Sequence, residues 1–135
     1  MNAHFDRVKG SSFSVLPPWA RKALGKVVVE SEDSVFFSVI VDVALAINEK
    51  LIAVIITVNE EYACVDEMWG DLNYRSRSYT DVYMVHRELG AHVVDVRDFF
   101  CFPKDVRVSK DGRKLTITSY GSDKVVLSVA KLLVS

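Results

Sequence analysis

Aspartates at expected strand positions are the first candidates for chemistry in this sequence. Asp42 lies within an apolar run, and Asp95 and Asp98 stand at the end of another. Carboxylates that strands bring together can bind Mg²⁺, which prefers oxygen ligands and can activate water for phosphodiester hydrolysis. Asp42, Asp95 and Asp98 are therefore candidate catalytic residues of a metal-dependent nuclease or phosphoesterase. Aspartates also commonly end strands and line loops, so no metal ligands are assigned, and Mg²⁺ is expected only under the nuclease hypothesis.

A second candidate site is the segment 73–79, in which two arginines alternate with serines between tyrosines. Guanidinium groups pair with phosphate oxygens, and tyrosine rings stack on unpaired bases. The candidate ligand-binding residues are Tyr74, Arg75, Arg77 and Tyr79. The formal net charge of −1 restricts any nucleic-acid contact to a local patch, because affinity for phosphate backbones grows with the number of basic side chains. The alternative is an ordinary solvated loop.

Other catalytic and cofactor motifs are missing from the sequence. Its serines form no GxSxG elbow, its six glycines are scattered, and its three histidines form no HExxH pair. The two cysteines, Cys64 and Cys101, form no CxxC pair and are too few for a disulfide framework. We interpret them as buried free thiols. The absence of these motifs favours a protein that is not an enzyme and binds no cofactor.

Length and composition predict a single globular domain over residues 1–135, with residues 1–12 as a candidate flexible terminus. Half of the residues are hydrophobic (50%) and about a quarter are charged (26%), unlike the composition of disordered chains. No repeat or linker marks a domain boundary. One core is therefore expected.

The same composition bears on compartment and source. The apolar runs Val35–Ala46 and Leu51–Val58 are too short to span a bilayer, and Met1–Gly10 has no apolar h-region of a signal peptide. We therefore expect a cytoplasmic protein without membrane contact. The chain contains no glutamine, and scarcity of thermolabile amides points to an archaeal thermophile or one of its viruses as the source.

In the N-terminal half, the pattern predicts a helix followed by three strands. Pro17 and Pro18 open the helix and Gly25 ends it. The expected strands, which form a meander, are Lys26–Glu30, Val35–Ile47 and Leu51–Val58. Every odd position from 35 to 47 is apolar, which favours a strand, although a polar stripe in the same run fits a helix.

The C-terminal half is expected to contain more helix. The predicted elements are helices over 60–69 and 80–89, a loop over 71–79, and a buried strand over 92–96 that adds in parallel. Asp111-Gly112 predicts a hairpin between the strands 105–109 and 113–119. The chain then ends in a helix that begins near Ser122 or, alternatively, in a strand over Lys124–Val129.

The order of helix, three-strand meander, helix and strand over residues 17–97, with Asp42 in the second strand, resembles the core of the restriction-endonuclease-like nucleases. In that family the next strand carries an acidic residue and a lysine two positions apart. Leu51–Val58 contains neither. The resemblance therefore implies an inactive relative of these nucleases rather than a working one.

Together these patterns predict an α+β fold. Its mixed sheet of five to six strands would combine the N-terminal three-strand meander with the C-terminal hairpin under two to four helices, with a three-layer α/β fold as the alternative. The predicted function is a non-enzymatic binding module, a homodimer that binds nucleic acid or another phosphate-bearing ligand. The alternatives are the metal-dependent nuclease, its inactive relative, and a protein-interaction or structural protein.

Overall fold

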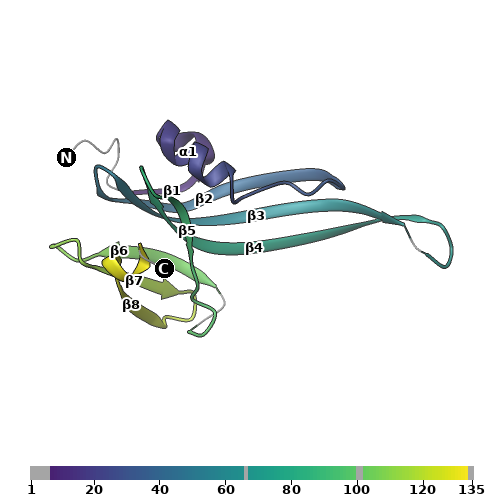
Figure 1. Cartoon of the computed structure of the whole chain (residues 1–135). Coiled ribbons are helices and arrows are strands. Elements are labelled where there is room, and N and C mark those ends of the chain that lie inside the picture. Colours follow the sequence, from purple (N-terminus) through teal and green to yellow (C-terminus); the bar gives the residue numbers. More distant parts are fainter. Residues whose placement is uncertain (1–6, 66, 100–101, 134–135) are drawn as a thin grey trace.

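The computed structural model describes residues 7–65, 67–99 and 102–133, which form two antiparallel sheets (Figure 1). The first sheet contains, in spatial order, β1 (Arg7–Ser12), β2 (Ser34–Asn48), β3 (Leu51–Val65), β4 (Leu72–His86) and β5 (Gly90–Val94). The second sheet contains β6 (Pro103–Val108), β7 (Lys114–Ser119) and β8 (Lys124–Ser128). The α-helices are α1 (Pro18–Gly25) and the single turn α2 (Val129–Leu132), and a 3₁₀ turn, Phe13–Val15, precedes α1.

The predicted α+β class is wrong, and so is its three-layer α/β alternative. All strand pairs in the described part of the chain are antiparallel, and the only long helix there is α1. The strand expected at 92–96 is β5, which pairs antiparallel with β4 instead of adding in parallel. The order of elements that resembled the restriction-endonuclease-like core over 17–97 is therefore not present.

Two helices were predicted where β3 and β4 form one long hairpin. In β4, Val82 and Met84 face one core while Tyr83 and Val85 face the other, so all four are buried. Burial on both faces removes the polar alternation that marks a strand. The segment 60–69 contains good helix formers, but pairing with β4 keeps it extended as far as Val65.

Elements with strong local signals were predicted correctly. These are the helix ending at Gly25, the strands and turn over 35–58, and the hairpin around Asp111-Gly112. The alternative strand over 124–129 is also confirmed, as β8. Lys26–Glu30, by contrast, is not a strand but part of the connection from α1 to β2.

The core has two halves, because α1 and the second sheet cover opposite faces of the first sheet (Figure 1). Alternate residues of β3 serve both halves: Ile52, Val54 and Ile56 pack with Leu24 of α1. Leu51, Ala53 and Ile55 pack with Leu115 and Ile117 of β7. β3 is the middle strand of the first sheet, and burial on both sides explains why both of its faces are apolar.

Beyond these layers the first sheet continues as an arm (Figure 1). We define the arm as residues 34–39, 57–65 and 72–80 of β2, β3 and β4. In the arm the sheet is narrowed to β2, β3 and β4, because β1 pairs only with Ile40–Leu45 and β5 pairs only with Val82–His86. At about 3.3 Å per residue, a strand of 15 residues such as β4 extends over roughly 50 Å.

The turn between β6 and β7 permits a first stability prediction. Gly112 has φ 74° and open space where a Cβ would lie, so a side chain there would strain only the backbone. We expect Gly112→Ala to lower the free energy of unfolding by about 1 kcal/mol and Gly112→Asn by less, because asparagine tolerates positive φ. Urea denaturation measures both; equal losses would contradict the conformational argument.

Candidate functional site

Asp42, the first candidate catalytic residue, occupies a bulge in β2. The pairing with β3 shifts by one residue between Val41 and Val43, which leaves Asp42 without an opposite residue. Its carboxylate accepts a hydrogen bond from the Thr57 hydroxyl, and the hydroxyl oxygens of Thr57 and Thr80 are 2.8 Å apart. This polar row crosses β2, β3 and β4 and supports a structural role for Asp42.

Asp95 and Asp98 follow β5, which is three strand spacings, or about 14 Å, from β2. Arg97 donates hydrogen bonds to Asp95 from Nε, Nη2 and the backbone N–H, at 3.1, 2.9 and 3.0 Å. These bonds lower the pKa of Asp95 to about 2, so it is ionised at neutral pH. Asp98 is exposed in the same turn. The structure therefore brings Asp95 and Asp98 near each other but not near Asp42.

Asp81 is a carboxylate that the sequence analysis did not single out. It lies partly buried in a depression of about 240 Å³ that also includes Asp95 and Arg97. Burial raises the pKa of Asp81, and the charge of Arg97 opposes this effect. Asp81 lies on the face of β4 that packs toward α1, whereas Thr80 lies on the opposite face. Because Asp42 is linked to Thr80 through Thr57, Asp42 and Asp81 do not share a site. Within residues 7–65, 67–99 and 102–133, no three acidic, histidine or cysteine side chains could together hold a metal ion.

The predicted loop over 71–79 is wrong from Leu72 onward, because residues 72–79 form the distal half of β4. Side chains alternate along a strand, so Arg75, Arg77 and Tyr79 share one face of the arm and Tyr74 lies on the other. The Arg77 guanidinium lies 5.6 Å from the centre of the Tyr79 ring. Arg75 and Tyr74 are exposed, whereas Tyr79 is partly buried, which raises its pKa.

Arg77 is already engaged by Glu60, a residue that the sequence analysis placed in a helix. Glu60 is 1% exposed, and its Oε1 lies 3.0 Å from Nε and 2.8 Å from Nη2 of Arg77. Its Oε2 accepts the N–H of Ser31 at 3.0 Å. The hydrogen bonds from Ser31 and then Arg77 lower the pKa of Glu60. Glu60 therefore fastens the connection between α1 and β2 to the arm.

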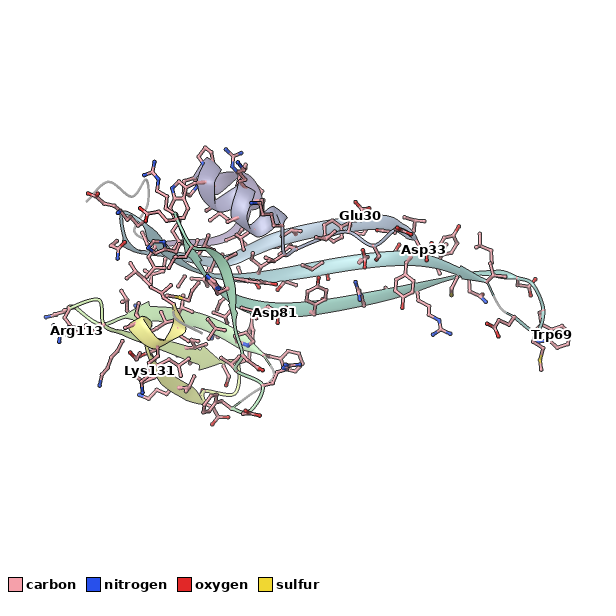
Figure 2. All side chains as sticks on the ribbon, in the orientation of Figure 1. Glu30, Asp33, Trp69, Asp81, Arg113 and Lys131 are labelled. Atoms are coloured by element: carbon pink, nitrogen blue, oxygen red, sulfur yellow. The ribbon has the colours of Figure 1, made fainter. Side chains whose placement is uncertain are left out.

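Several large apolar side chains are exposed together at the end of the arm. We define the tip as Val65 and residues 67–72 together with Tyr74. Met68 and Trp69 are 82% and 74% exposed, and the other large apolar side chains of the tip are exposed over more than half of their surface. Figure 2 places Trp69 at the far end of the molecule. Grouped aromatic and apolar side chains of this kind are typical of contact surfaces.

A groove lies at the opposite end of β4, between α1 and the turn that leads to β5. Its volume is about 610 Å³, and its apolar lining includes Trp19, Val27 and Leu89. Its charged lining is formed by Lys22, Lys26, Arg87 and Glu88. Glu88 pairs with Lys50 at 3.1 Å, so the remaining charges of the groove lining, on Lys22, Lys26 and Arg87, are basic.

Charge is unevenly distributed between the two ends of the molecule. The sequence from 59 to 76, which spans the tip, holds five acidic residues and one arginine. The sequence from 103 to 131, which spans the second sheet, holds seven basic residues and three acidic ones. Figure 2 shows Arg113 and Lys131 at the end of the molecule away from Trp69. The near-zero net charge therefore conceals an acidic tip and a basic second sheet.

Comparisons with protein-family models, with curated proteins and with solved structures find no match to this chain. Neither helix in the described part of the chain has the length and apolar character that crossing a membrane requires. Cys64 is a partly buried free thiol on β3, and Cys101 lies outside the described residues.

Proposed function

We propose that this protein is a non-enzymatic protein-interaction module that contacts its partner through the tip of the arm. The observation that carries the proposal is the apolar tip, with Met68 and Trp69 exposed at the end of strands of 15 residues. Contact of large apolar side chains with water is unfavourable, and the free energy falls when a partner covers them. A long, hydrogen-bonded hairpin presents them at little further entropic cost.

The charge of the tip favours a protein partner over nucleic acid. Glu67 and Asp71 flank Met68 and Trp69, and a polyanion would be repelled by them. Arg77 would have to leave a buried carboxylate to bind phosphate. Arg75 and Tyr74, which are both exposed, make a phosphate-bearing ligand the second candidate.

A site-specific crosslink tests the proposal. A photoreactive phenylalanine analogue would replace Trp69 and, as a control, Tyr120 of the second sheet, which is 70% exposed. After irradiation in an extract of cells that make the protein, position 69 should yield a protein adduct that survives nuclease treatment, and position 120 should yield much less. Equal yields would contradict the proposal, and a nuclease-sensitive adduct would favour the second candidate.

A further inference from the structure

We propose that the tip of one copy binds the groove between α1 and β5 of a second copy. This inference rests on the proposed function and names its partner as the same chain. The groove and the tip match in chemistry, and their positions in the fold require two copies.

The chemical match is both apolar and electrostatic. Trp19, Val27 and Leu89 in the groove offer an apolar surface to the tip, on which Trp69 is the largest side chain. The groove volume of about 610 Å³ lies in the range of clefts that enclose small ligands, so it can hold an indole ring.

Opposite charges surround these apolar surfaces. Glu67 and Asp71 beside Trp69 are exposed and acidic, whereas Lys22 and Lys26 beside the groove are exposed and basic. Contacts between opposite charges at the rim of an interface mainly speed association and set orientation. The tip of the arm therefore suits this groove better than it suits an acidic surface.

A chain cannot fill its own groove. Leu72 at one end of β4 adjoins the tip, and His86 at the other end adjoins the groove, roughly 45 Å away along a continuous strand. Two antiparallel copies that exchange tips would form a closed, two-fold symmetric dimer, which is the predicted homodimer. Head-to-tail contacts would instead form a ring or an open chain.

Sedimentation velocity of the purified full chain tests the contact. From about 1 to about 100 μM the wild type should associate, as a dimer or a longer chain, and association should weaken at high salt. Trp69→Ser in the tip and Lys22→Glu/Lys26→Glu in the groove should each weaken it by at least about tenfold. The matched controls, Tyr120→Ser and Lys110→Glu/Lys124→Glu, also change exposed residues and should associate like the wild type.

Mixing the two defective variants adds a test of stoichiometry. The Trp69→Ser protein keeps its groove and the Lys22→Glu/Lys26→Glu protein keeps its tip, so a mixed pair has one intact contact and no mixed complex should be larger than one-to-one. A monomeric wild type at 100 μM, association unaffected by the variants, or a mixed complex larger than one-to-one would overturn the inference. The proposed function would survive these results if position 69 still gave a nuclease-resistant adduct with another protein in higher yield than position 120, and would fail without that difference.

Discussion

The Ile55→Ala variant should lose about 2–5 kcal/mol of unfolding free energy relative to the wild type. Ile55 is 0% exposed on β3 and belongs to the half of the core that lies between the two sheets. Truncation removes its buried methyl and methylene contacts and leaves a cavity that neither sheet can close fully. Urea denaturation followed by circular dichroism measures the loss.

Two further variants make this result specific. Ile40→Ala removes the same atoms from a position on β2 that is 39% exposed, and it should cost less than about 1 kcal/mol. Ile117→Ala, in the second sheet, should lower the same single transition that Ile55→Ala lowers, because both residues occupy one cluster. Two separate transitions would instead show that the sheets unfold independently, against the predicted single domain over residues 1–135.

Arg77→Ala should lower the melting temperature by roughly 5–10 °C, and Arg75→Ala should change it little. The two arginines lie on the same face of β4, but only Arg77 pairs with a fully buried carboxylate. Removal of the Arg77 side chain leaves the buried Glu60 carboxylate charged, with the hydrogen bond from Ser31 as its remaining partner. Adding Glu60→Gln to Arg77→Ala should restore part of the loss, because the amide carries no charge. Equal losses from the two single variants would contradict the role assigned to Glu60.

The same ion pair supplies a pH test. The pKa of Glu60 is lower in the folded protein than its ordinary value of 4.5, so folding favours the ionised form. Its stabilisation is therefore present above that value and is lost as the pH falls through the folded pKa. The melting-temperature difference between wild type and Glu60→Gln should be constant near neutral pH and should shrink below about pH 4.5.

The sequence predicted those elements whose evidence is local. Proline at the start of α1, the apolar run of β3 and Asp111-Gly112 each specify a conformation within a few residues. The arm lacked such evidence, because both faces of its distal half are in water and the segment 71–79 therefore shows no apolar alternation. Its strand conformation depends on pairing with β3.

The candidate site was predicted only in part for the same reason. The segment with Arg75 and Arg77 was identified, but which of its side chains share a face could be known only once it was a strand. Glu60 gains its role from Ser31 and Arg77, which are 29 and 17 residues away. The sequence around Trp69 does not predict its exposed position, because no local pattern indicates that this residue lies at the end of a long arm.

The bulge at Asp42 gives the apolar run of β2 a second meaning. Its odd-numbered residues looked like one apolar face, yet Phe37, Val39 and Val41 pack toward α1. Val43, Leu45 and Ile47 pack toward the second sheet. One extra residue thus acts like a frameshift: odd-numbered side chains face α1 before the bulge and face the second sheet after it. Over its evolution this strand could exchange one apolar residue for another, but a lost or gained residue at this point would direct three apolar side chains to the wrong layer.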